Sequence, residues 1–270
     1  MNLTIISQKI QKKHKYLFQS AIVTVFLYLF SIGKIHFDVW YLLLIVIALV
    51  IFGTLITQYP NIDLKNVLYI ILMPLSLIIG ALLFLNFFPN LGFVFKLAAI
   101  ISFGISYYFV SLVDNVFLVV QGREEVIPLY RVATAWSQII QVVVAIPLFS
   151  GIFKLSVNGV IQGVLIGIVS FFYVVYQIWA SRYDKDAKNT GVGETVLLST
   201  LGLFLVSAAS ITVSFIPAEA FLRALLISAV LMFVLSYIAS YLRNDINKKM
   251  MIQFVFIFVV FFLLILVFTP

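Results

Sequence analysis

The fold is decided by stretches such as residues 157–181, VNGVIQGVLIGIVSFFYVVYQIWAS, which contain no Asp, Glu, Lys or Arg. An α-helix rises 1.5 Å per residue, so about 20 apolar residues cross the hydrocarbon core of a bilayer. This stretch therefore predicts a transmembrane helix. The whole chain of 270 residues is 64% hydrophobic and only 10% charged. Soluble domains carry about 25% charged residues, so the composition excludes an ordinary soluble protein.

The same criterion predicts an all-α bundle of nine transmembrane helices joined by short loops. The predicted spans are approximately 16–33, 39–57, 67–88, 93–120, 128–153, 157–181, 195–216, 219–242 and 250–268. We expect the first to be a retained helix, because its apolar run is longer than that of a cleaved signal peptide. Residues 1–270 are thus predicted to form a single integral membrane domain, with a basic cytoplasmic tail over residues 1–15 and no soluble domain.

The basic residues predict the orientation of this bundle. If the amino terminus is cytoplasmic, only Lys34, Lys96, Lys154 and Arg223 of the 17 basic residues fall on the outer side. The positive-inside rule asks for this asymmetry, so we expect the carboxy terminus outside and a multi-pass protein of the cell (inner) membrane. We interpret the net charge of +7 as basic residues that set the topology and contact membrane lipids. No nucleic-acid partner is expected.

The residues that are missing exclude several kinds of chemistry. The chain has no cysteine, and its two histidines, His14 and His36, lie outside the apolar segments. We therefore expect no metal, no cofactor and no catalytic residue, and the sequence does not favour an enzyme. The adjacent Glu124 and Glu125 invite comparison with the prenyl-protein-processing intramembrane proteases, but the arginine spacing and the membrane histidines of that family are missing.

One pair of charged residues stands out inside the apolar segments. Asp114, followed by Asn115, lies about six residues inside the inner end of the fourth span, and Arg131 lies in the first turns of the fifth. Each charge is costly in lipid, so we expect a hairpin to bring Asp114 and Arg131 together. The pair is interpreted either as a functional site or as a structural staple, with Arg131 reaching the headgroups as a further alternative.

Polar residues also follow helical spacing on the fifth and sixth spans. Thr134, Gln138 and Gln141 continue the face of Arg131, and Gln162 belongs to the sixth span. These side chains predict either a polar cavity entered from the cytoplasm or hydrogen bonds that hold helices together.

Gly159, Gly163 and Gly167 form a ridge four residues apart on the sixth span. Such a ridge predicts a helix packed very closely against it. A membrane protein partner or a homo-oligomer is one further expectation.

One stretch of the chain resembles an uncharacterised family of polytopic membrane proteins from candidate-phylum bacteria. The residues that carry the resemblance are 115–117, Arg123, 127–129 and 131–136. The resemblance covers only residues 115–136. It implies a bacterial inner-membrane location and supplies no activity.

Three classes of function remain open from the sequence. The first is a small transporter, channel or lipid-translocating protein with a polar cavity among the fourth to sixth spans. The second is a non-catalytic membrane subunit or scaffold of a larger complex. The third, disfavoured by the missing His and Cys, is a lipid-modifying enzyme that uses Glu124, Glu125 and Asp114.

Overall fold

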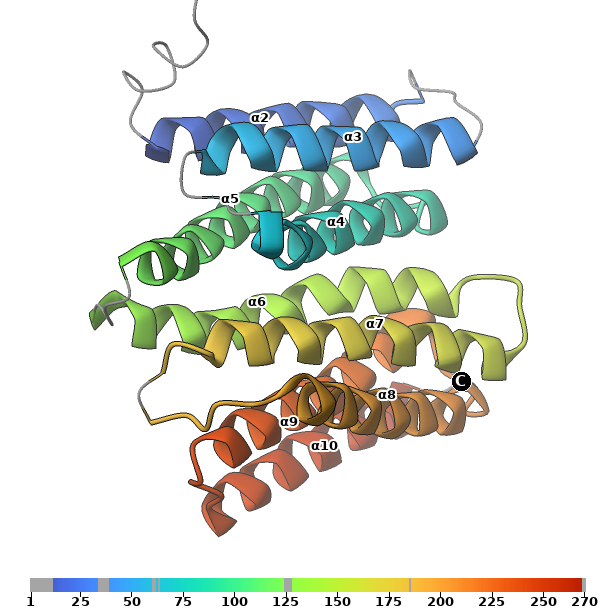
Figure 1. The fold of residues 1–270 in the computed structure, drawn as a ribbon. Helices are drawn as coiled ribbons and strands as arrows, with labels where there is room; N and C mark the ends of the chain where they lie inside the picture. Colours follow the sequence, from blue (N-terminus) through green and yellow to red (C-terminus); the bar gives the residue numbers. More distant parts are fainter. Residues whose placement is uncertain are drawn as a thin grey trace, which may run out of the picture. The chain divides into compact units, whose positions relative to one another are not determined.

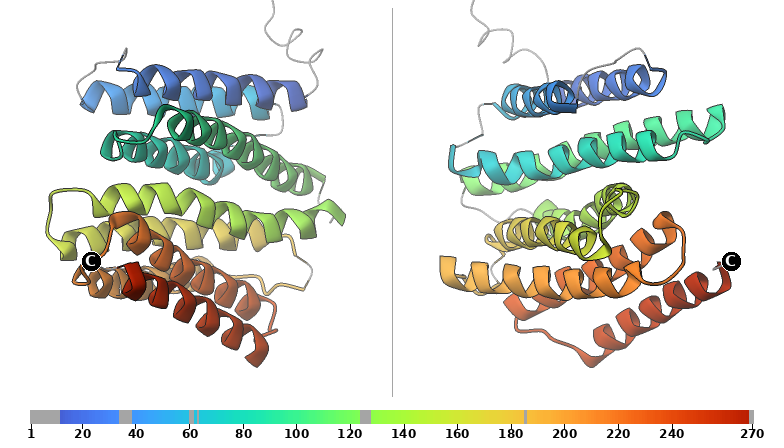
Figure 2. Two further views of the ribbon diagram at one scale, coloured as in Figure 1. Left: turned by 180° about the vertical axis from the view of Figure 1, so that it is seen from behind. Right: turned by 90° about the vertical axis from the view of Figure 1, so that its right-hand side faces the viewer.

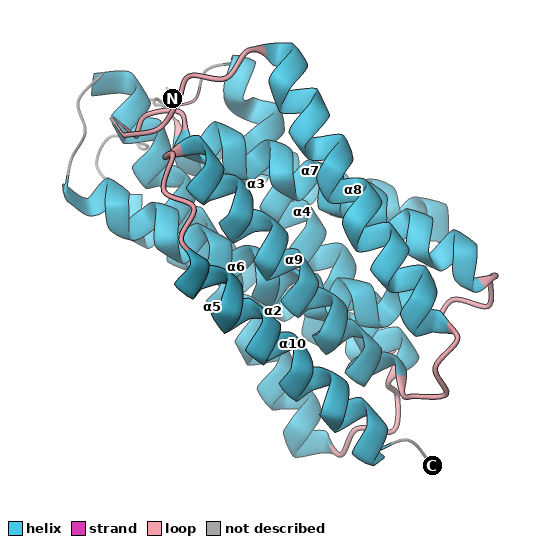
Figure 3. Ribbon diagram, turned by 90° about the horizontal axis from the view of Figure 1, so that it is seen from below, coloured by secondary structure: helices cyan, strands magenta, loops and turns pink. Residues whose placement is uncertain are grey.

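The computed structural model describes residues 12–33, 39–59, 62, 64–123, 128–184 and 186–268, and all the helices in these ranges are α-helices. Figure 1 labels them and Figure 3 shows the loops that join them. The described helices are α2 (Lys12–Ser31), α3 (Val39–Gln58), α4 (Leu64–Phe87), α5 (Phe93–Arg123), α6 (Pro128–Phe153), α7 (Gly159–Ser181), α8 (Val192–Ser214), α9 (Ala220–Leu242) and α10 (Lys248–Phe268).

The all-α prediction is confirmed, and each predicted span corresponds to one described helix. By length and composition, α3 to α9 are able to cross a membrane, which makes this an integral membrane protein with several spanning helices. Among the described residues, α2 and α10 do not meet this criterion of length and composition. The count of nine spans and the sides of the two termini therefore stay predictions.

The chain divides by its internal contacts into two compact units, and each is described by itself. Unit 1 is Met1–Arg123 and unit 2 is Glu124–Pro270. The sequence predicts one integral membrane domain over residues 1–270. It does not predict the division after Arg123.

Unit 1 contains α2 to α5. Its most extensive contact joins α2 to α5, and α4 packs against both α3 and α5. Val23 and Leu27 of α2 and Met73 of α4 are among its fully buried apolar side chains. Because α2 precedes α5 by about 80 residues, this contact is set by tertiary packing and not by a hairpin turn.

Unit 2 contains α6 to α10. The hairpin of α7 and α8 makes its most extensive contact, α6 packs against α9, and α10 packs along α9 (Figure 2). Leu226, Leu231 and Leu235 of α9 are fully buried, so α9 is the central helix of this unit.

The two faces of these helices have the polarity expected of a protein dissolved in lipid. Phe52 of α3 and Phe204 of α8 are about two-thirds exposed, whereas Asp114, Gln141 and Ser210 are wholly buried. Large apolar side chains on the outside are stable against acyl chains, and polar side chains in the interior are kept away from them.

Candidate functional site

A buried cluster of polar side chains joins α2, α3 and α5 in unit 1. The Tyr16 hydroxyl of α2 donates to Gln58 Oε1 of α3 at 3.1 Å, and Gln58 Nε2 donates to the backbone oxygen of Ser111 on α5 at 3.1 Å. Tyr16 and Gln58 are each 1% exposed. A single chain of hydrogen bonds therefore crosses all three helices without reaching solvent.

A second set of hydrogen bonds in the same cluster is centred on Gln19 of α2. Its carboxamide is satisfied on both sides when its oxygen accepts from the Tyr107 hydroxyl at 2.5 Å and its nitrogen donates to Thr57 Oγ1 at 3.0 Å. A Cβ atom at Gly53 would overlap this carboxamide, so a larger residue at this position would have to displace the Gln19 side chain from its hydrogen bonds. The next residue of α2, Ser20, donates its Oγ hydroxyl to the Gly104 oxygen of α5 at 2.6 Å.

Asp114 is the ionisable group of this cluster. It is 0% exposed and lies one turn beyond Ser111 and two turns beyond Tyr107 on α5. Its carboxyl group interacts electrostatically with the hydroxyls of Tyr16 and Tyr107. The neighbouring Asn115 is partly buried, and its Oδ1 has no hydrogen-bond partner among the described residues. A buried carboxyl group therefore lies within electrostatic range of two tyrosine hydroxyls of the cluster.

A second polar cluster lies in unit 2, between α6 and α7. Gln141 Nε2 donates to Gln177 Oε1 at 2.8 Å, and Ser137 Oγ lies 3.4 Å from the same oxygen. Thr134 is 3% exposed and Gln141 is 0% exposed, and Thr134 Oγ1 donates to the backbone oxygen of Arg131. These side chains are packed together and support the hypothesis of interhelical hydrogen bonds.

The remaining predicted polar residues of unit 2 have separate partners. Gln138 Oε1 of α6 accepts from Ser236 Oγ of α9 at 3.4 Å. Gln162 Nε2 donates to the backbone oxygens of Phe153 at 3.3 Å and Leu155 at 2.8 Å, at the end of α6. Gln162 therefore caps carbonyl groups that have no partner within α6.

Arg131 forms an ion pair with Asp186 at 3.4 Å, in which both side chains are more than two-thirds exposed. An exposed pair of this kind contributes little to stability. Arg131 belongs to unit 2 and Asp114 to unit 1, so their pairing stays a prediction. Glu124 and Glu125 lie outside the described residues.

The glycine ridge of α7 faces α8. A Cβ at Gly163 would lie 3.1 Å from Ile211 N and 3.2 Å from Ser207 O, and a Cβ at Gly167 would lie 2.8 Å from Ser207 Cβ. At Gly159 a Cβ would overlap Ser214 Oγ. The backbones of α7 and α8 approach this closely only because glycine has no side chain.

The loop between α7 and α8 is tied to the end of α9. Asp184 is 7% exposed and accepts from Arg243 Nη2 at 2.7 Å and from Arg243 Nε at 2.8 Å. Lys188 N donates to the Leu242 oxygen at 2.6 Å. Lys188 Nζ donates to Glu194 Oε1 at 2.8 Å, and this hydrogen bond raises the pKa of the Lys188 ammonium group. The loop is therefore docked onto unit 2, although its charges and glycines favour a freely solvated connector.

The comparisons with family models, curated proteins and solved structures find no match to this chain. Function therefore has to be argued from the site. Within the described ranges, no three His, Cys, Asp or Glu side chains are grouped so that they could hold a metal ion.

The sequence interpretation misses the part of the unit 1 cluster that comes from α2 and α3. Gln19, Thr57 and Gln58 lie in segments that are otherwise strongly apolar. A sequence signal for this cluster exists, because polar residues on each helix are spaced within one helical turn and so share one face. These residues are Tyr16, Gln19 and Ser20 on α2, and Thr54, Thr57 and Gln58 on α3.

Proposed function

We propose that the protein is a small membrane transporter in which Asp114 is the group that binds and releases the coupling proton or cation. We place it in the inner membrane of a bacterial cell. One observation supports this proposal above all others. The Asp114 carboxyl group is 0% exposed on a helix apolar enough to span a membrane, and it interacts electrostatically with the hydroxyls of Tyr16 and Tyr107.

The energetics of this environment favour a switchable group. An ionised carboxylate costs about 2.5–3.5 kcal/mol at the centre of a spanning helix on insertion scales and less toward the helix end, where Asp114 lies, and protonation or a bound cation removes that cost. A change in the charge of Asp114 would alter its interactions with Tyr16 on α2 and Tyr107 on α5.

The test is proton movement by the purified protein in sealed liposomes that contain a pH-sensitive dye. We expect a membrane potential to drive internal pH change with wild-type protein. Asp114→Asn keeps the size and polarity of the side chain but cannot bind a proton, and we expect it to lower the rate at least about tenfold. Glu219→Gln is the matched control, because Glu219 is an exposed acid at the start of α9, and its rate should equal that of wild type.

Two results would overturn the assignment to Asp114. One is an equal rate of proton movement in wild type and Asp114→Asn. The other is wild-type protein that moves neither protons nor, in the same liposomes, sodium or potassium ions in an Asp114-dependent way.

A non-catalytic membrane subunit is the second candidate, and the packing of unit 2 favours it. Gln141 is bonded to Gln177 and the glycine ridge of α7 is covered by α8, so these features serve the assembly of helices. Mild-detergent purification from native membranes distinguishes the two candidates. A subunit should migrate with a stoichiometric partner, whereas a self-sufficient transporter should migrate alone or as a homo-oligomer.

A further inference from the structure

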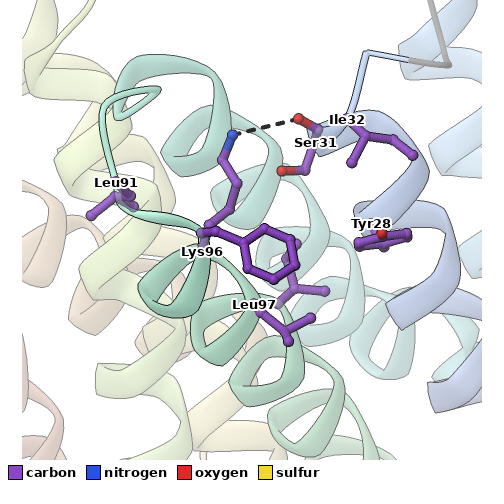
Figure 4. Close-up of a pocket in the computed structure, with 8 residues that line it drawn as sticks. Tyr28, Ser31, Ile32, Leu91, Lys96 and Leu97 are labelled. Carbon is purple, nitrogen blue, oxygen red and sulfur yellow. Dashed lines mark hydrogen bonds between the residues drawn. The ribbon is translucent and has the colours of Figure 1, made fainter.

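A pocket of about 350 Å³ lies in unit 1 where α2 ends and α5 begins. Tyr28, Ser31 and Ile32 line it from the end of α2, and Phe93, Lys96 and Leu97 line it from the start of α5. Figure 4 shows the Lys96 side chain reaching from α5 toward the last residues of α2. Among the described residues that line the pocket, Lys96 is the cationic one and the others are mostly apolar.

The hydrogen bonding of Lys96 leaves it able to bind an anion. Its Nζ donates to the Ser31 backbone oxygen at 3.5 Å, which is at the long limit for a hydrogen bond. An ammonium group has three donors. The hydroxyl Oγ of Ser31 is buried and has no hydrogen-bond partner among the described residues. The Lys96 ammonium group is therefore available to a ligand, and the unpartnered Ser31 hydroxyl belongs to another residue that lines the same pocket.

The position of Lys96 on α5 also favours an anion. α5 begins at Phe93 and has no acidic residue in its first turn, and Lys96 follows within that turn. The amino-terminal end of a helix carries a partial positive charge, so a cation placed there is unfavourable unless an anion offsets it. A negatively charged ligand would stabilise both the helix end and the ammonium group.

The surroundings indicate where that anion comes from. Phe93 and Phe95 at the start of α5 are 70% and 73% exposed, and Tyr28 and Leu97 present apolar surface beside the pocket. Tyr28, which is 38% exposed at the end of α2, is of a residue type enriched at the membrane–water interface. A phospholipid fits such a pocket, because its phosphate can bind the cation and its acyl chains can contact the apolar residues.

We propose that this pocket binds the phosphate group of an anionic phospholipid, with Lys96 and Ser31 contacting the phosphate. Tyr28 and Leu97 then contact the carbons next to the headgroup. The site lies apart from the buried cluster around Asp114, and the proposal does not depend on transport.

The test is lipid binding measured by native mass spectrometry on the full chain in micelles that contain phosphatidylglycerol or phosphatidylcholine. We expect wild type to retain one phosphatidylglycerol with an affinity that Lys96→Gln lowers about tenfold, since a charge-assisted hydrogen bond is lost. Lys96→Arg should retain the lipid, and Ser31→Ala should weaken binding to a smaller extent. Lys154→Gln removes an exposed lysine at the end of α6 and should bind like wild type.

Three outcomes would overturn the proposal. Equal retention of phosphatidylglycerol by wild type and Lys96→Gln would show that Lys96 only caps the end of α2. Equal retention of phosphatidylcholine and phosphatidylglycerol by wild type would remove the requirement for an anion. Binding of inorganic phosphate that depends on Lys96, with no retained phosphatidylglycerol, would make the free anion the ligand. A melting temperature for each variant separates these outcomes from loss of the fold.

Discussion

At the scale of single residues, two aspartates in one loop have opposite surroundings. Asp184 is buried and bonded twice to Arg243, whereas Asp186 is exposed and 3.4 Å from Arg131. Both lie between α7 and α8, only two residues apart in a loop rich in charged residues. Nothing in their sequence context separates them, because burial depends on the approach of the α9 carboxyl end to the loop.

This difference predicts unequal effects of the same substitution. Asp184→Ala should lower the free energy of unfolding by about 1–2 kcal/mol, because charge-assisted hydrogen bonds to Arg243 are lost from a partly buried site. Asp186→Ala is the matched control and should change it by less than about 0.5 kcal/mol, since its ion pair is exposed. Thermal unfolding in detergent measures both. Similar losses in the two variants would contradict the docked loop.

At the scale of helices, the close approach of α7 and α8 depends on single glycines. A methyl group at Gly163 would meet the backbone nitrogen of Ile211 and the backbone oxygen of Ser207, and neither can move as a flexible side chain does. The hairpin of α7 and α8 is also the most extensive helix contact of unit 2. Separation of these helices should therefore weaken the whole unit.

We expect Gly163→Ala to destabilise the protein by about 1–3 kcal/mol through overpacking. Gly193→Ala is the control, because the structure shows nothing within 4 Å of a Cβ at that position in the first turn of α8. It should be neutral or raise stability by up to about 1 kcal/mol, since alanine favours a helix over glycine. Unfolding in increasing denaturing detergent compares the two. A neutral Gly163→Ala would show that α7 and α8 can move apart at no cost.

At the scale of the whole molecule, orientation in the membrane is open to a direct experiment. The chain has no native cysteine, so a single introduced cysteine can be labelled without background. Asn189 in the loop between α7 and α8 and Ser156 in the loop between α6 and α7 are both exposed. The charge asymmetry predicts that the first is cytoplasmic and the second is outside.

An impermeant maleimide applied to intact cells should therefore label Ser156→Cys and leave Asn189→Cys unlabelled. Permeabilised cells should give label at both positions, which controls for reactivity. Labelling of Asn189→Cys alone in intact cells would reverse the orientation. Labelling of both would contradict a membrane-spanning α7.

The sequence by itself determined the helices, because long apolar runs form helices in lipid, and in α3 to α9 the run is long enough to span a bilayer. It also singled out Asp114, since one acid in such a run is detectable without knowing its neighbours. The partners of that acid were decided only by tertiary structure. Tyr16 meets Gln58 across 42 residues of sequence, Gln19 meets Tyr107 across 88, and Gln141 meets Gln177 across 36. Hydropathy and helical spacing describe one helix at a time, and which two polar faces meet depends on how all the helices pack.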